Sequence, residues 1–389
     1  MKDRLLFLIC LCTAIIGFAA YSATAKIDPY RKVKIAETNR VKNAETLVEP
    51  SEKPIEDFDY DSMPICHDTA LYTYTIGGLG NQIILFIFTY AISIVHKIPI
   101  YYPSDSVFDK FLIIKNYFPG QVNVFNDTRT TDRTIDPKEN EKVIDINRLT
   151  ATNNFIRSLQ DNTICKVYAG KKLILTGYQD AHKFLLPLDI YKKILGKFSL
   201  YSESIYKYVY PYPVYRFENL FLQESIIPNP IVQEHMASFF PDYNSKRFLS
   251  VHLRFGGGVA DYKDIESRMA HVKPDYVVHY IEAVCNKTKE NIVYLASDST
   301  NMKNYIKEHL PKTLTVITAP IEKVASTDLF IAGREVKSKY EIDAVTELFL
   351  LRHGSDCIGS MKSSFSKFAC SNIDHEGFLL TSDTKNNIV

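Results

Sequence analysis

One short stretch, residues 247–261 (RFLSVHLRFGGGVAD), constrains the fold of this chain more than any other. Its first part, Phe248–Leu253, is apolar apart from Ser250 and His252, which predicts a short buried strand. The strand brings Arg254 to its carboxyl end, and three consecutive glycines follow. Ligands of open α/β sheets bind at such strand ends, and a fixed guanidinium beside a bare backbone suits a phosphate-bearing ligand. For a single strand-end arginine a surface ion pair is the commoner role, so the rest of the chain must decide.

The second half of the chain alternates short apolar segments with helix-length segments. Strands are expected at residues 292–295, 314–317 and 357–359, and helices at 273–286, 301–310, 341–352 and 363–370. Alternation of this kind is typical of a parallel sheet covered by helices. We therefore predict an α/β fold with a Rossmann-like domain over residues 241–382.

A second unit of the same kind begins near Cys66. A strand over residues 71–76 is followed by GGLGNQ (residues 77–82), an apolar helix over 83–96 and a strand at 100–102. This order is a βαβ unit, and the amino end of its helix offers N–H groups to an anion or a sugar hydroxyl. Many glycine turns are merely tight connections, however. The first Rossmann-like domain is predicted to span residues 65–240, with another strand at 171–176. Within this domain we expect surface loops at 115–133 and 136–142. Residues 186–240 are expected to form helices broken by prolines.

The amino terminus predicts entry into the secretory pathway. Lys2 and Arg4 precede an uncharged run over residues 5–25, which as a helix would span about 31 Å, enough to cross a bilayer. The positive charges predict a cytoplasmic amino end and a luminal body. A signal peptide cleaved after Ala23-Thr24-Ala25 is the alternative to a retained anchor.

Residues 26–64 have the composition of a disordered stem, because they are rich in charge and lack apolar periodicity. The stem contains two Asp-x-Asp triplets, at 57–59 and 59–61, which resemble the metal signature of manganese-dependent glycosyltransferases. Both precede the first predicted strand instead of following one, so we interpret them as part of a solvated acidic linker and predict no metal site.

Composition excludes some partners and sets the expected cysteine chemistry. With 46% apolar residues and a net charge of +1 over 389 residues, the chain should form a core and offers no electrostatic case for nucleic-acid binding. Five of seven cysteines lie outside the apolar run, so at most two internal disulfides form and one thiol is left over. Asn126 and Asn286 begin the sequons N-D-T and N-K-T and are candidate glycosylation sites.

Two polar clusters follow predicted strands of the second half. Asp298 could accept hydrogen bonds from a ribose hydroxyl or a guanine edge, and it or the next residue could equally cap the following helix. Ser363, Ser364 and Ser366 offer hydroxyl and N–H groups at a helix amino end, an arrangement that suits a diphosphate and is compatible with capping. A strand histidine such as His252 is more often packed and hydrogen-bonded than catalytic.

Taken in order, five segments resemble motifs of the α-1,2-fucosyltransferase family. They are GGLGNQ, LTGYQDAHKF, VHLRF, YLASDS and CIGSMKSSFSKFA, and the family's patterns are G-[RG]-L-G-N-Q, a GY-x-Q-type segment, H-x-R-R-x-D, F-x-F-S-D-D and N-S-[ST]-F-S-W-W-x-A. The resemblance runs from about Leu71 to Ala369, and GGLGNQ and SSFSKFA are its most specific parts. The HLRF and SDS segments are also similar to those of protein O-fucosyltransferases.

This resemblance implies a GT-B fold, in which residues 65–240 form the acceptor-side domain and 241–382 the GDP-fucose-binding domain, facing each other across a cleft. It implies GDP-fucose as donor and inverting transfer without a metal or other cofactor. Arg254 matches the arginine that holds the donor diphosphate, and Asp298 falls on the position that contacts the nucleoside. The remaining implied donor-binding positions are His252, Ser363, Ser364, Phe365, Ser366, Gly78, Gly80, Asn81 and Gln82.

The chain departs from the family's pattern in three places. Phe255 stands where the family has a second arginine, and the dipeptide at 367–368 replaces a pair of tryptophans. Gly257 displaces the motif's acid, which leaves Asp261 as the nearest candidate for a catalytic acidic residue and Glu266 as a second one.

We therefore expect a galactoside α-1,2-fucosyltransferase-like enzyme, a single-pass type II Golgi membrane protein that acts on a glycan or glycoprotein acceptor. One alternative is an enzyme of the protein O-fucosyltransferase type. The other is a luminal nucleotide-binding protein without catalysis, which the phenylalanine at position 255 favours.

Overall fold

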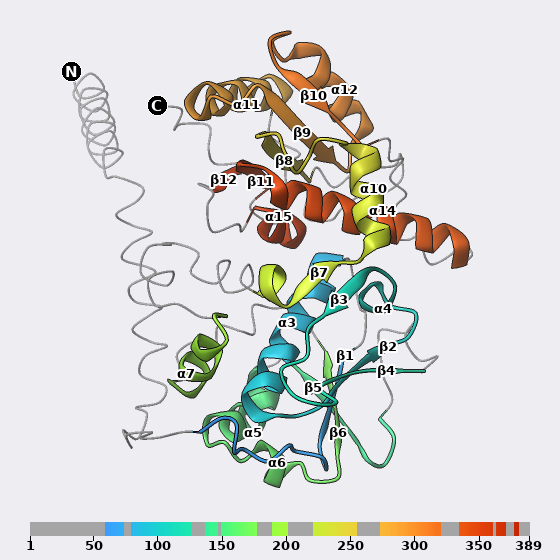
Figure 1. Cartoon of the computed structure of the whole chain (residues 1–389), viewed down its shortest axis with the longest axis vertical. Coiled ribbons are helices and arrows are strands. Elements are labelled where there is room, and N and C mark those ends of the chain that lie inside the picture. Colours follow the sequence, from blue (N-terminus) through green and yellow to red (C-terminus); the bar gives the residue numbers. More distant parts are fainter. Residues whose placement is uncertain are drawn as a thin grey trace, which may run out of the picture. The chain divides into compact units, whose positions relative to one another are not determined.

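The computed structural model describes residues 59–73, 79–126, 137–146, 149–176, 189–200, 221–254, 273–319, 334–360, 363–370 and 377–380. The chain from Asp59 onward forms one compact unit. The unit contains two five-stranded sheets, one in each of two α/β lobes, which Figure 1 shows in blue to green and in yellow to red. The predicted anchor at 1–25 and residues 26–58 of the predicted stem lie outside the described residues.

The first lobe is built on a parallel sheet of strand order β4-β2-β1-β6-β5. Its strands are β1 (Ala70–Thr73), β2 (Ile100–Pro103), β4 (Val122–Phe125), β5 (Glu141–Asp145) and β6 (Lys172–Thr176). Its helices are α3 (Leu79–His96), α4 (Val107–Phe111), α5 (Leu149–Gln160), α6 (Ile164–Val167) and α7 (Asp189–Lys197). The strand, helix and second strand predicted over residues 71–102 are confirmed as β1, α3 and β2, and residues 74–78 between β1 and α3 lie outside the described residues.

Helix α3 is the main core element of the first lobe. It is long and apolar enough to cross a membrane, yet 83% of its 18 residues are buried inside the protein. Phe86, Phe88 and Tyr90 on this helix are fully buried. Because core helices share the length and composition of membrane spans, we interpret α3 as a core helix.

The second lobe is also built on a parallel sheet, of order β10-β9-β8-β11-β12. Its strands are β8 (Leu249–Leu253), β9 (Ile292–Ser297), β10 (Thr315–Ile317), β11 (Asp356–Ser360) and β12 (Gly377–Leu380). Its helices are α11 (Pro274–Thr288), α12 (Thr300–His309), α14 (Arg334–His353) and α15 (Ser364–Ala369). All five residues of β8 are buried, as expected for a central strand covered on both faces.

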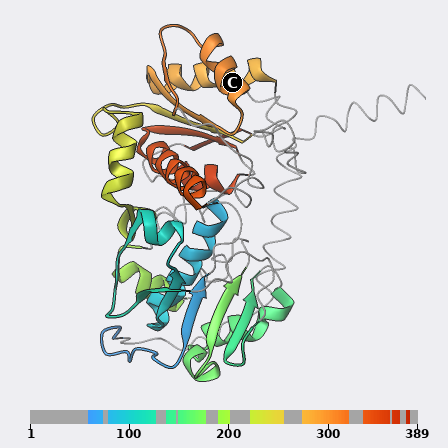
Figure 2. The same ribbon diagram turned by 90° about the vertical axis from the view of Figure 1, so that its right-hand side faces the viewer.

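A small antiparallel ribbon and one helix connect the lobes. Strand β3 (Leu112–Ile114) pairs with β7 (Ile226–Pro228), and α10 (Pro230–Phe239) leads on toward β8. Asn229 caps α10 by accepting a hydrogen bond from the N–H of Val232 and donates its side-chain N–H to the carbonyl of Lys110 on α4. Lys110 also forms an ion pair of 3.4 Å with Glu341 on α14. Figure 2 shows the arrangement from the side, with α3 reaching toward the red helices of the second lobe.

Three parts of the first half differ from the sequence-based expectation. Residues 115–133 and 136–142 were expected to be loops, but they contain β4 and the beginning of β5. The region 186–240 was expected to be helical, and it also contains strand β7. Finally, the folded body includes residues 59–64, assigned to the stem by composition: Tyr60 is 3% exposed and donates a hydrogen bond of 2.8 Å to the carbonyl of Ile94.

The expected cysteine chemistry is confirmed. Cys66 is bonded to Cys165 and Cys357 to Cys370. Cys285 remains a buried free thiol, and its burial, with Glu290 and Glu282 nearby, raises the pKa of the thiol to about 11. A thiol with so high a pKa is a poor nucleophile, so it is not expected to exchange with the two disulfides.

His96, at the end of α3, is a buried neutral histidine. Its Nδ1–H donates to Oδ1 of Asn162 and its Nε2 accepts from the hydroxyl of Tyr191, both at 2.8 Å. The ring is 2% exposed, and burial lowers the pKa of His96 to about 4. Because the unfolded chain has an ordinary histidine pKa near 6.5, it binds the proton first as the pH falls.

We therefore expect His96 to make the protein acid-sensitive. Its contribution to stability is complete above pH 6.5 and is lost as the pH falls toward 4, at a cost of roughly 2 kcal/mol between pH 7 and pH 5. Urea unfolding at both pH values checks this: His96→Gln should reduce the difference by about that amount. The exposed His309→Gln is the control, and an equal pH dependence in wild type and His96→Gln would contradict the assignment.

Candidate active site

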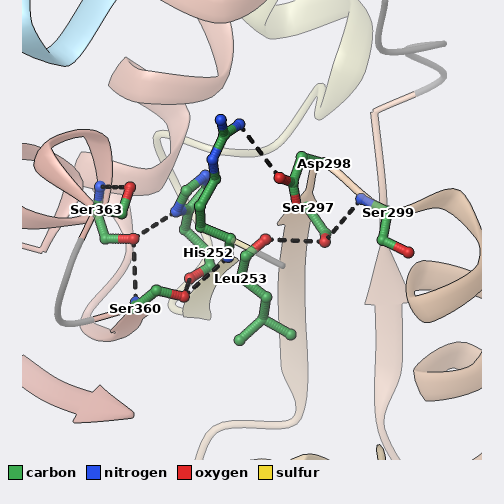
Figure 3. A network of polar contacts seen from close by, with 9 residues as sticks. His252, Leu253, Ser297, Asp298, Ser299, Ser360 and Ser363 are labelled. Carbon is green, nitrogen blue, oxygen red and sulfur yellow. Dashed lines mark hydrogen bonds and ion pairs between the residues drawn. The ribbon is translucent and has the colours of Figure 1, made fainter. Parts of the chain in front are cut away.

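The candidate site lies where three neighbouring parallel strands, β9, β8 and β11, end. Arg254 follows the last residue of β8, and its backbone N–H donates to Oγ of Ser360 at the end of β11, at 2.8 Å. Its Nη1 lies 3.2 Å from Oδ2 of Asp298, which follows β9 (Figure 3). The Arg254 side chain is 34% exposed and that of Asp298 only 8%. A ligand approaching this edge of the sheet therefore meets the guanidinium, and the buried carboxylate holds the guanidinium from the side.

The end of β9 shows which residue caps the following helix. Oγ of Ser299 accepts a hydrogen bond from the N–H of Met302 and is the N-cap of α12. Oγ of Ser297 donates to the carbonyl of Leu253 and accepts from the N–H of Ser299 (Figure 3). Of the two roles weighed for Asp298, capping thus belongs to Ser299, and the Asp298 carboxylate faces Arg254.

The N-cap and the first three residues of α15 carry the predicted serines, and we call these residues, 363–366, the serine turn. Oγ of Ser363 caps α15 by accepting from the N–H of Ser366 at 3.3 Å. Oγ of Ser366 accepts from the N–H of Ser360 at 3.0 Å and shares a hydrogen bond of 2.5 Å with Nδ1 of His252. Ser363 and Ser366 are both almost fully buried, so the turn is held in one conformation.

His252 supports the serine turn from β8. It is 4% exposed, and its ring packs against that of Phe365 with centroids 4.7 Å apart. Its backbone carbonyl accepts a hydrogen bond from Oγ of Ser360. The prediction of a packed, hydrogen-bonded histidine is confirmed, and the partner it holds is the turn on which the predicted ligand site depends.

The glycine-rich turn of the first lobe reaches the same place. Gly80, Asn81 and Gln82 lie in the first turn of α3, and Oγ of Ser364 donates to Oδ1 of Asn81 at 2.9 Å. Segments near residues 81, 254, 298 and 364 are thereby linked in one hydrogen-bonded region that involves both lobes.

Some predicted residues lie elsewhere or outside the described part. Gly78, Phe255, Gly257, Asp261 and Glu266 lie outside the residues that the structure describes, and with Asp261 so does the predicted catalytic acidic residue. Asn126, just after β4, and Asn286, in the last turn of α11, are both exposed. In the described residues no group of three or more His, Cys, Asp or Glu side chains could hold a metal ion.

Ser297 and Ser360 are the members of this site that sequence reasoning missed. Each is the last residue of a buried strand and bonds to the backbone next to Arg254. Their position in the sequence could have identified them, because each ends an apolar run. Ser297 immediately precedes Asp298, and Ser360 lies within the segment CIGSMKSSFSKFA, which was already predicted to bind a ligand.

Comparison with known proteins supports the fold at low sequence identity. No family model and no curated protein matches the chain. A mutant of Arabidopsis thaliana FUT1 in complex with GDP is similar in structure, with 10% identity, a TM-score of 0.52, and 81% of this chain and 70% of that chain covered. NodZ α-1,6-fucosyltransferase from Bradyrhizobium, soaked with GDP-fucose, has 14% identity, a TM-score of 0.42, and coverage of 78% and 91%. POFUT1 in complex with GDP-fucose has 14% identity, a TM-score of 0.41, and coverage of 82% and 98%. The chain has the predicted α/β GT-B fold.

Proposed function

We propose that this chain is an inverting glycosyltransferase that transfers fucose from GDP-fucose to a hydroxyl of a glycan, as α-1,2-fucosyltransferases do. One observation carries the proposal: Arg254, Asp298 and the serine turn meet at the carboxyl ends of three adjacent strands. A nucleoside diphosphate needs a cation and N–H donors for its phosphates and a hydrogen-bond acceptor for its nucleoside, and these residues supply all three. The similar Arabidopsis thaliana structure holds GDP.

The main task of the site in such a reaction is to stabilise the departing GDP. The acceptor oxygen attacks the anomeric carbon of fucose while the bond from that carbon to the β-phosphate oxygen breaks. The bonding electrons remain on the phosphate, and attack from the opposite face inverts the configuration. The N–H groups of Ser363 and Ser366 already bond within the protein, so Arg254 and the N–H groups of Ser364 and Phe365 would neutralise the charge that develops on the β-phosphate, without a metal ion.

The remaining roles follow from this arrangement. The acceptor's hydroxyl proton must pass to a base, and we propose Asp261, which follows the three glycines after Arg254 in sequence, for that step. We propose that Asp298 accepts hydrogen bonds from the nucleoside and that His252 and Phe365 keep the serine turn in place. Gly78, Gly80, Asn81 and Gln82 would bring the amino end of α3 to the donor.

We also propose a type II Golgi membrane protein, anchored by residues 1–25 with a stem before the folded body. The two disulfides support an oxidising compartment, and Asn126 and Asn286 are exposed as N-glycosylation requires. Glycosidase treatment tests for the glycans directly. It should change the gel mobility of the wild-type protein and leave that of the Asn126→Gln/Asn286→Gln variant unchanged.

The decisive experiment measures fucose release and transfer from GDP-fucose by the full chain, purified in mild detergent, with a chelator present. We expect fucose transfer to galactoside acceptors, and we expect that adding Mg²⁺ or Mn²⁺ does not increase the rate of this transfer. Transfer only to folded protein domains would favour the protein O-fucosyltransferase type. GDP binding without fucose release would favour a non-catalytic binding protein, the candidate that Phe255 supports. A chain that binds neither GDP nor GDP-fucose would contradict the proposal.

A further inference from the structure

The two lobes touch directly at the serine turn. Helix α3 of the first lobe and α15 of the second are in contact at their amino ends. The hydroxyl of Ser364 donates to Oδ1 of Asn81 at 2.9 Å, although the two residues are 283 positions apart in sequence. The turn that we assign to the donor diphosphate is therefore held by the other lobe as well as by its own.

Gly80 is what allows the two helix ends to come so close. A Cβ atom at this position would lie 2.6 Å from Oγ of Ser364 and 2.7 Å from the backbone nitrogen of Phe365. Contacts below 3.0 Å are essentially never made by real Cβ atoms, and a backbone nitrogen cannot rotate away as a side chain can. Any larger residue at position 80 must therefore push α3 away from the serine turn.

The serine hydroxyls hold the turn in shape. Oγ of Ser363 accepts a hydrogen bond from the N–H of Ser366. Oγ of Ser366 is hydrogen-bonded to Nδ1 of His252 and to the N–H of Ser360. Oγ of Ser364 donates a hydrogen bond to Oδ1 of Asn81. Each hydroxyl thus has a protein partner, and only that of Ser364 reaches into the first lobe. The hydrogen bond to Asn81, together with the close packing against Gly80, therefore allows the first lobe to set the geometry of the turn.

We propose that Gly80 and Asn81, with Ser364 and Phe365, form an interlobe latch that fixes the serine turn for the donor diphosphate. Asn81 is then a positioning residue that acts on the donor through Ser364, and Gly80 sets the spacing of the lobes. The effect on transfer rests on the proposed function, whereas the effect on the turn does not. The latch couples the acceptor-side lobe to the donor site, so that the site is complete only when the two lobes are in contact.

Hydrogen exchange of the backbone amides at 364–370 tests the latch without any ligand. Asn81→Ala removes a hydrogen-bond acceptor on the first lobe. We expect exchange in this segment of the second lobe to become about fivefold faster, because a typical hydrogen bond contributes about 1 kcal/mol, which corresponds to about a fivefold change in an equilibrium constant. Asn81→Asp keeps an oxygen in the same place and should restore the wild-type rate. Gly80→Ala should reproduce the effect of Asn81→Ala by steric separation.

Lys110→Met is the matched control, because it breaks the ion pair with Glu341 that links the lobes through α4 and α14. We expect it to leave exchange at 364–370 unchanged. Wild-type exchange rates in Asn81→Ala, or equal acceleration by Lys110→Met, would overturn the latch whether or not the protein binds GDP.

Donor kinetics then separate the latch from the proposed function. Asn81→Ala and Ser364→Ala should each raise the KM for GDP-fucose about fivefold, and the double variant should be no worse than the more affected single one, because both remove the same hydrogen bond. Additive effects would overturn the coupling. Faster exchange in Asn81→Ala, with GDP binding undetectable even in wild type, would leave the latch standing and refute the proposed function.

Discussion

Replacing Arg254 with alanine is expected to reduce fucose transfer by about 10²–10³-fold. Preorganised donors that meet developing charge typically contribute this much, and Arg254 is the cation that the structure places beside the serine turn. Arg254→Lys keeps the charge and can still pair with Asp298, but it lacks the planar, two-donor geometry that matches a phosphate. We therefore expect the lysine variant to be intermediate. Initial rates with GDP-fucose, together with the affinity for GDP, measure both effects.

The folded state must be shown to survive this substitution. Arg254 is one-third exposed, and its backbone hydrogen bond to Ser360 does not depend on the side chain. Arg254→Ala should therefore still fold, although its melting temperature should fall below that of wild type, because the mostly buried Asp298 carboxylate loses this ion pair. Arg157→Ala, an exposed arginine on α5, is the control for the loss of one positive charge. Transfer at the wild-type rate by a folded Arg254→Ala protein would remove Arg254 from the reaction and with it the main support for the proposed function.

The sequence predicted the central strands of the second sheet, its edge strand β10 and the helices between them. β8, β9 and β11 are covered on both faces, so their residues form nearly continuous apolar runs bounded by helices. β4 and β5 were missed, and both lie at the edges of the first sheet. Edge strands are partly solvated: Val124 is 45% exposed, and β5 begins with Glu141 and Lys142. β5 therefore has the composition of a loop, whereas β4 (VNVF) is a short apolar segment, and pairing with a neighbouring strand shows that each belongs to the sheet.

The candidate site likewise has a part that the sequence predicts and a part that depends on contacts between distant segments. Arg254, Asp298 and the serine turn were predictable because the carboxyl ends of parallel strands meet at one edge of a sheet. The contact between Asn81 and Ser364 was not, because it depends on how the two lobes pack against each other. Gly80 shows the limit clearly: its sequence context indicated a tight turn, whereas the structure shows that its missing side chain makes room for another helix.

Removing the Cys66–Cys165 disulfide is expected to have the largest effect on stability. The bond closes a chain segment with a sequence separation of 99, which contains β1, α3, β2, β4 and β5. A cross-link over a loop of this length restricts the unfolded chain by about 4–5 kcal/mol, whereas Cys357–Cys370, with a separation of 13, contributes about 3 kcal/mol. Urea unfolding of Cys66→Ser/Cys165→Ser and of Cys357→Ser/Cys370→Ser measures the two losses.

Activity should follow the opposite order, because only the Cys357–Cys370 bond encloses the serine turn. The N–H of Cys66 donates to the carbonyl of Lys97, just past the carboxyl end of α3 and far along that helix from Gly80. Cys357 and Cys370, in contrast, flank the serine turn in sequence and close it into a loop. The Cys66/Cys165 variant should therefore keep a wild-type KM for GDP-fucose at temperatures where it is folded, while the more stable Cys357/Cys370 variant loses donor affinity. If the Cys66/Cys165 variant bound GDP-fucose more weakly than the Cys357/Cys370 variant, then stability, and not the geometry of the turn, would limit the reaction.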